Sequence, residues 1–113
     1  MVGVPHLGIL RQGFLDKKGV LNPSFQRRWF VLRNLSMTYY KSSQDTTAQG
    51  TIALSAASLQ VLTRFEFILS VNTGRDFVLS ASLEKDMRRW FCAIRRHMID
   101  PLYIQHDVRY RDN

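Results

Sequence analysis

The chain has few of the residues that would indicate a secreted, metal-binding or membrane-spanning protein. Its 113 residues include one cysteine, Cys92, so no internal disulfide can form, and its three histidines show no metal-ligand spacing. No run approaches the roughly eighteen apolar residues of a membrane span. The N-terminus lacks the basic head and apolar stretch of a secretory signal. These absences favour a cytoplasmic protein, with no metal and no cofactor expected.

Sequence signatures of enzymes are missing as well. There is no glycine-rich phosphate loop, no nucleophile elbow and no His-Glu helix motif. Ser80 and Cys92 have no paired base visible in the sequence, and the aromatic signature of RNA-recognition domains is absent. The sequence therefore predicts neither catalysis nor nucleic-acid binding.

Acidic residues are scarce relative to basic ones, and the imbalance is greatest near the N-terminus. The chain has 16 Lys and Arg against 9 Asp and Glu, a net charge of +7. Residues 1–41 hold seven Lys or Arg and one Asp, whereas residues 42–81 hold two and three. A clustered positive field favours an anionic partner such as a membrane surface or a phosphorylated headgroup. A solvated basic face without a ligand is the alternative interpretation.

The sequence does contain enough apolar residues for a single folded domain. Hydrophobic residues make up 45% of the chain, which argues against disorder. Alternating apolar positions and turn residues predict seven strands, at 9–18, 25–33, 37–41, 51–54, 59–62, 65–71 and 77–81. The segments 19–24, 42–50 and 72–76 are predicted loops.

From residue 82 the apolar spacing changes from two to three or four. This spacing predicts an amphipathic helix with Ser82 as its N-cap, formed around six apolar residues: Leu83, Met87, Trp90, Phe91, Ile94 and Met98. Seven strands followed by one helix indicate an α+β, mostly β, fold. A sheet of this length should curl on itself and leave one end for the helix to cover.

The segment 24–41 is typical of a binding mouth built on a closed core. Alternation places Gln26 and Arg28 on the same face as Phe30, and the following strand adds Tyr39 and Lys41 to that face. The apolar positions lie at one end of the face and the polar or basic positions at the other. We therefore expect an anion to bind at the basic end.

Three motifs together resemble the opening of a pleckstrin homology (PH) domain. They are G-F-L-D-K-K-G at 13–19, F-Q-R-R-W-F-V-L at 25–32 and M-T-Y-Y-K at 37–41. Trp90 resembles the characteristic tryptophan of the family's C-terminal helix, and the match runs from about Gly8 to about Ile99. The resemblance implies a seven-stranded, partly open antiparallel β-barrel capped by a C-terminal α-helix. It places the domain at 8–100, between a lead-in at 1–7 and an extension at 101–113.

The resemblance also implies which residues surround a phosphoinositide headgroup. Lys17 matches the family's lysine late in the first strand, Arg28 the arginine of the second and Tyr39 the tyrosine of the third. Gln26 stands where the lipid-binding pattern has Lys or Arg. Lys18 and Lys41 are further candidate donors to the phosphates.

A secondary basic surface next to the mouth is predicted from Arg11 and Arg27, together with Lys18. Such a surface attracts acidic lipid at about 1 kcal/mol per basic residue.

The resulting prediction is a non-catalytic module that binds phosphoinositide headgroups on anionic membranes and recruits its parent signalling or trafficking protein there. We expect it to be a cytoplasmic protein, peripherally associated with membranes and monomeric as an isolated domain. The alternative is a protein-interaction PH domain, with a small GTPase or scaffold partner and weak or no lipid binding. The departure at Gln26 favours that alternative.

Overall fold

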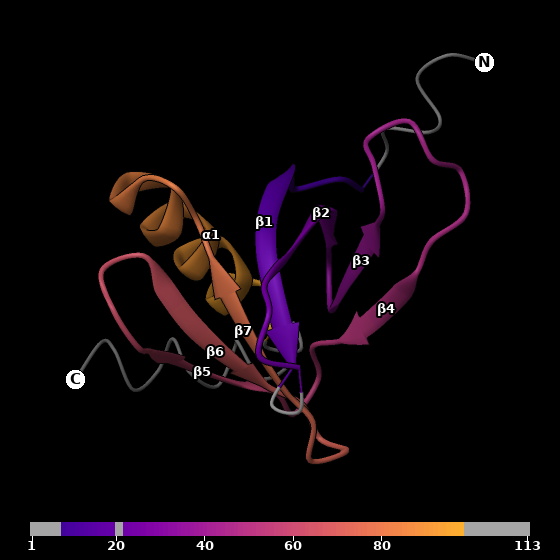
Figure 1. Cartoon of the computed structure of the whole chain (residues 1–113). Coiled ribbons are helices and arrows are strands. Elements are labelled where there is room, and N and C mark those ends of the chain that lie inside the picture. The colour runs from indigo at the N-terminus through magenta and orange to yellow at the C-terminus, as the bar shows by residue number, and fades with distance from the viewer. Residues whose placement is uncertain (1–7, 20–21, 99–113) are drawn as a thin grey trace.

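The computed structural model describes residues 8–19 and 22–98, so the predictions for 1–7 and 101–113 lie outside the described residues. All seven predicted strands are present, each within two residues of its predicted bounds (Figure 1). They are β1 (Arg11–Gly19), β2 (Gln26–Arg33), β3 (Ser36–Tyr40), β4 (Gly50–Ala53), β5 (Ser58–Val61), β6 (Glu66–Ser70) and β7 (Asp76–Ser80). The helix α1 (Glu84–Arg96) follows them. In the part of the chain so described, no helix has the length and apolar content to cross a membrane.

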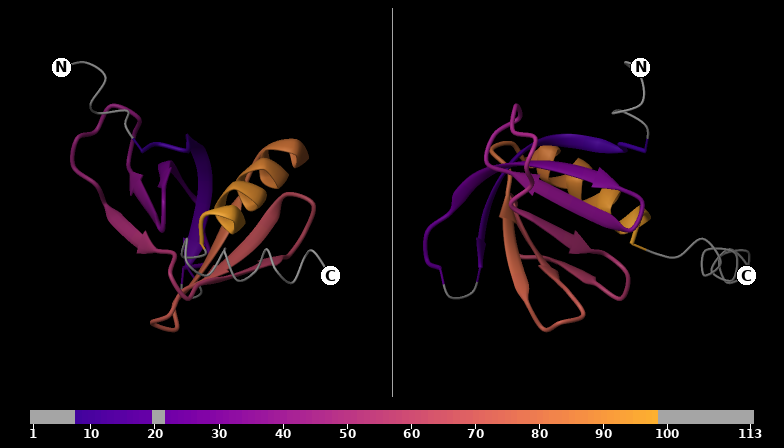
Figure 2. Two further views of the ribbon diagram at one scale, coloured as in Figure 1. Left: turned by 180° about the vertical axis from the view of Figure 1, so that it is seen from behind. Right: turned by 90° about the vertical axis from the view of Figure 1, so that its right-hand side faces the viewer.

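The strands form one antiparallel sheet in the order β4-β3-β2-β1-β7-β6-β5. Two meanders, β1 to β4 and β5 to β7, are therefore joined where β7 pairs with β1. The sheet curls around the core, but no hydrogen-bonded pairing between β4 and β5 closes it (Figures 1 and 2). The prediction of a partly open antiparallel barrel with a C-terminal helix is confirmed.

The core is made by the inward-facing residues of the strands. Strands β3, β6 and β7 each alternate buried and half-buried positions, as expected when one face of a sheet packs inside. The side chains with almost no exposed surface are Leu15, Phe30, Leu32, Met37, Leu54, Phe67, Leu69, Leu79 and Ile94. Ile94 belongs to α1, so the core extends from the curled sheet to one side of the helix.

Helix α1 covers the packed end of the barrel and lies at the upper left of Figure 1. It buries Met87, Trp90 and Ile94 against the sheet. Its C-terminal end is attached to the β2–β3 turn, where the amide of Leu35 donates a hydrogen bond of 3.1 Å to the carbonyl of His97. The helix therefore holds the two meanders together at the end opposite the open mouth.

The prediction of Ser82 as N-cap was wrong by one residue. The capping position is Leu83, which has extended backbone angles and makes no side-chain capping bond. The carbonyl of Leu83 already accepts the amide of Met87, so the helical hydrogen-bond pattern begins there. Acidic Glu84 and Asp86 in the first turn compensate the helix dipole without a polar cap.

Candidate functional site

Three cationic side chains gather at the end of the barrel opposite α1, and we call them the cationic mouth: Lys17, Arg28 and Arg75. Lys17 comes from the end of β1, Arg28 from the start of β2 and Arg75 from the loop that leads into β7. The strand pairing brings these segments together, because Leu15 faces Arg28 in β2 and Gly19 faces Phe77 in β7. The end of β1 and the β6–β7 loop both lie at the bottom of Figure 1.

Two aromatic rings lie beneath two of these cations, Lys17 and Arg75. The Lys17 ammonium lies 4.9 Å from the centroid of the Tyr39 ring and 5.9 Å from that of Phe77, and the Arg75 guanidinium lies 4.6 Å from that of Phe77. Tyr39 and Phe77 are themselves buried, and Tyr39 packs on Phe30 with 5.5 Å between ring centroids. The rings attract Lys17 and Arg75 by cation–π interaction and separate them from the apolar core.

The cations of the mouth repel one another. Partial burial lowers the pKa of Lys17 below its ordinary value, and the neighbouring charges of Arg75 and then Arg28 lower it further. Arg28 donates a 2.7 Å hydrogen bond to the carbonyl of Arg27, while its Nε is buried without a hydrogen-bond partner. Positive charge and unused donors are thus held together at this end of the barrel.

No carboxylate neutralises the cationic mouth within residues 8–19 and 22–98. The ion pairs in those residues are Arg27–Asp16, Arg64–Glu84 and Arg88–Glu84, and none of them includes Lys17, Arg28 or Arg75. Partial burial beside two like charges disfavours the charged form of Lys17. This cluster is therefore a site at which an anion would relieve electrostatic repulsion.

The other residues predicted for the mouth differ in position. Gln26 pairs with Lys17 across β1 and β2 and is exposed, so its amide lies beside the cluster without adding charge. Lys18 alternates to the outer face of β1, where its ammonium lies 4.8 Å from the centroid of the Phe25 ring. Lys41 follows β3 and is exposed, and no ion pair or hydrogen bond connects its ammonium to another residue that the structure describes.

The predicted secondary surface is divided between two separate places. Arg27 lies on the outer face, where it pairs with Asp16 at 3.4 Å and stacks over Phe14. Arg11 lies at the start of β1, about 20 Å along the strand from Lys17, and its guanidinium covers the Trp90 ring at 5.1 Å. Placing Arg11 next to the mouth was wrong, because alternation gives the face of a strand and not the end of the barrel.

Arg75 is the member of the mouth that the sequence did not reveal. It lies in the loop between β6 and β7, which reads as an ordinary hairpin turn. Its place beside Lys17 depends on the pairing of β7 with β1, two strands separated by more than fifty residues. A basic residue directly before the last strand was the one available signal.

Comparison with known proteins identifies the family to which these features belong. A family model described as "PH domain" matches residues 9–98. Among curated proteins, the chain is 35% identical over 118 residues to Rho GTPase-activating protein 22 of Mus musculus, and 32% identical over 95 residues to Sesquipedalian-1 of Homo sapiens. These matches cover 88% and 80% of the chain but only 17% and 38% of the two relatives.

Solved structures show the same fold. The carboxyl-terminal PH domain of pleckstrin superposes with a TM-score of 0.74 at 23% identity, over 80% of this chain and 98% of that one. A Slm1-PH domain solved with phosphoserine gives a TM-score of 0.71 at 21% identity, over 77% of this chain and 92% of that one. At these identities the likeness establishes the architecture.

Proposed function

The chain belongs to the PH domain family, and on that basis we propose that it is a non-catalytic module that binds phosphoinositide headgroups at the cationic mouth. In this proposal the module brings the protein that carries it to anionic membrane from the cytoplasm. The observation that supports it is the grouping of Lys17, Arg28 and Arg75 with no carboxylate among the described residues to neutralise them.

The chemistry of the three cations suits a headgroup that carries more than one phosphate. Arginine grips a phosphate with two parallel hydrogen bonds, whereas lysine acts as a point charge. The Nε of Arg28 is buried with no hydrogen-bond partner among the described residues, so it is a free donor, and Arg75 is exposed at the rim. A phosphate between the cations also reduces the repulsion that lowers the pKa of Lys17.

Relatives of known structure support the same class of ligand. The C-terminal PH domain of pleckstrin was solved with an inositol pentakisphosphate, at 24% identity to this chain, and the Slm1-PH domain was solved with inositol 4-phosphate, at 20%. Those ligands are properties of those proteins. For this chain the proposal depends on its own cations.

The experiment is co-sedimentation with liposomes that contain one phosphoinositide at a time, in about 0.15 M salt. The matched pair of variants is Arg28→Ala, in the mouth, and Arg95→Ala, exposed in the last turn of α1. Both lose one positive charge, so general attraction to anionic lipid falls equally. We expect one lipid to be preferred and only Arg28→Ala to abolish the preference. Equal loss in both variants, following total lipid charge, would refute a specific site.

The second candidate is a protein-interaction module with a small GTPase or scaffold partner. The observation that favours it is Gln26, which leaves the position paired with Lys17 uncharged. This function predicts that Arg28→Ala leaves partner binding intact. Absence of liposome binding by the wild-type chain would make it the leading function.

A further inference from the structure

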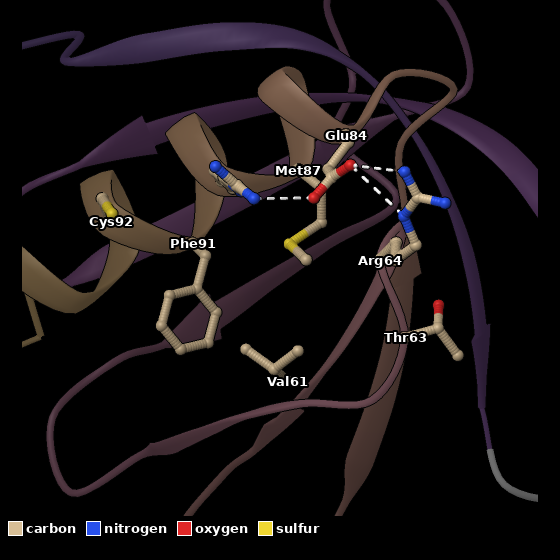
Figure 3. Close-up of a pocket in the computed structure, with 8 residues that line it drawn as sticks. Val61, Thr63, Arg64, Glu84, Met87, Phe91 and Cys92 are labelled. Carbon is tan, nitrogen blue, oxygen red and sulfur yellow. Dashed lines mark hydrogen bonds and ion pairs between the residues drawn. The ribbon is translucent and has the colours of Figure 1, made fainter.

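A groove of about 350 Å³ lies between α1 and the end of β5, far from the cationic mouth (Figure 3). Val61 forms one wall, and Met87 and Phe91 face it from the helix. The floor is continuous with the core, because the Phe91 ring packs edge-on against the buried Phe67 at 5.8 Å. Val61 keeps 54% of its surface exposed, so the apolar wall of the groove is accessible.

The backbone beside this groove is available for pairing. Strand β5 is the last strand of the sheet, and among residues 8–19 and 22–98 it pairs only with β6. Its outer edge therefore presents amide and carbonyl groups without strand partners. A peptide in extended conformation can add to such an edge and place alternate side chains into a neighbouring apolar groove.

The rim of the groove is basic, which restricts the partner. Arg64 and Arg88 both bond to Glu84, at 3.1 Å and 2.7 Å between nitrogen and oxygen. The hydrogen bond from Arg64 and the charges of both arginines lower the pKa of Glu84, so this single carboxylate stays ionised and is shared by two cations. Lys85 and Arg89 extend the positive surface along the same part of α1. The excess positive charge complements an acidic partner.

We propose that this groove binds a short acidic peptide from a protein partner, extended along the edge of β5. An apolar side chain of the peptide fills the space between Val61, Met87 and Phe91. Carboxylates on either side of it pair with Arg64 and Arg88. A flat membrane fits this geometry poorly, because the apolar wall of Val61 and Phe91 is recessed between a strand and a helix.

The proposal is tested by selecting peptides that bind the domain. Random seven-residue peptides displayed on phage are selected against the whole 113-residue chain, and enriched peptides are synthesised and measured by fluorescence anisotropy. We expect sequences with an apolar residue flanked by Asp or Glu, with amide chemical-shift changes in β5 and the first half of α1. No enrichment, or enrichment without acidic bias, would overturn the proposal.

Two pairs of variants locate the binding. Val61→Glu is compared with Leu10→Glu, since Leu10 is an exposed aliphatic residue outside the groove. Arg88→Glu is compared with Arg95→Glu on the same helix. We expect the groove variant of each pair to bind the selected peptides about tenfold more weakly or worse, as for a residue at the centre of an interface. Its control should bind them with little change. Thermal unfolding of each variant separates lost binding from lost fold.

Peptide binding at the groove should not depend on the cationic mouth. Arg28→Ala should bind the selected peptides as well as the wild-type chain does, whether or not the mouth binds lipid. Peptides that bind Val61→Glu unchanged, or that move the amides of Lys17 and Arg28 in place of those in β5, would show that the groove is not the site.

Discussion

The Lys17 ammonium lies 4.9 Å from the centroid of the Tyr39 ring, on the boundary between the barrel core and the cationic mouth. Tyr39 is 8% exposed, so the ring serves the core on one side and the cation on the other. The attraction to the ring opposes the repulsion from Arg28 and Arg75. The charge of Lys17 therefore destabilises the free domain, and a bound anion would relieve this cost.

Replacing Lys17 with Met should stabilise the free domain while it removes anion affinity. Met keeps the packing on Tyr39 but ends the repulsion from Arg28 and Arg75. We expect a gain of about 0.5 kcal/mol in the free energy of unfolding and a rise of about 2–4 °C in Tm. The control is Lys41→Met, which alters an exposed lysine. A lower Tm for Lys17→Met than for Lys41→Met would show that the charge is not unfavourable in the free fold.

The lowered pKa of Lys17 predicts how affinity for an inositol phosphate depends on pH. In the free protein, burial and the charges of Arg75 and Arg28 lower the pKa of Lys17, so its ammonium loses its proton at a lower pH than an ordinary lysine does. A bound phosphate would stabilise the protonated form. Affinity should therefore fall as the pH rises above the free-state pKa. Calorimetric titration with inositol hexakisphosphate from about pH 7 to pH 10 measures the decline. The Lys17→Met variant shows how affinity changes with pH through ionisation of the ligand alone. If affinity depended on pH in the same way in the variant and in the wild-type chain, the prediction would be contradicted.

The lowered pKa of Lys17 affects folding stability in the opposite direction: as the pH rises, anion affinity falls but stability increases. The folded-state pKa of Lys17 is lower than its unfolded value, so between the two values the unfolded chain binds more protons. The unfavourable contribution of Lys17 is complete below the folded pKa and declines as the pH rises through it. The stability difference between Lys17→Met and the wild-type chain should consequently shrink at alkaline pH.

Arg75 should contribute to anion binding as strongly as Arg28, although no motif identifies it. Loss of a charge-assisted hydrogen bond costs about 1.5–3 kcal/mol, or roughly ten- to a hundredfold in affinity. Arg75→Ala is measured beside Arg64→Ala, because both guanidinium groups stack on an aromatic ring and Arg64 lies by the groove next to α1. Equal affinities for inositol hexakisphosphate in the two variants would remove Arg75 from the site.

Local patterns in the sequence were sufficient to predict the strands and two of the three cations of the mouth. Alternation placed Lys17, Arg28 and Tyr39 on inward faces, and adjacent strands joined by short turns must pair, so these residues were expected to meet. Arg75 was not expected to join them because its position follows from the pairing of β7 with β1. Arg11 was misplaced for a different reason, because alternation gives the face of a strand and not the end of the barrel, and Arg11 lies at the far end of β1, over Trp90.

Introducing the missing charge at position 26 should strengthen lipid binding. Gln26 is exposed and pairs with Lys17 across the two strands, so a longer cationic side chain can reach the mouth without disturbing the core. We expect Gln26→Lys to raise affinity for the preferred phosphoinositide by about tenfold, and to make binding more sensitive to salt. Gln12→Lys, on an exposed position of β1, is the control for general charge. Equal gains in both would indicate a non-specific electrostatic effect.

Gly50 supports the mouth by leaving room for Tyr39. The two residues pair across β3 and β4, and a Cβ at position 50 would overlap the Tyr39 hydroxyl and the adjoining ring carbons. Gly50→Ala must therefore displace a ring that packs on Phe30 and lies under Lys17. We expect a loss of about 1–3 kcal/mol in the free energy of unfolding, as for other overpacked sites, together with weaker binding of inositol hexakisphosphate.

The matched control for this change is Gly19→Ala, because a Cβ at Gly19 meets no atom of the residues that the structure describes within 4 Å. Both substitutions add one methyl group to a strand residue, so they share any general effect of replacing glycine. Urea unfolding gives the difference between them, and calorimetry gives the difference in affinity. If Gly50→Ala matched Gly19→Ala in both, Tyr39 would have space to move, and the mouth would not depend on where its ring is held.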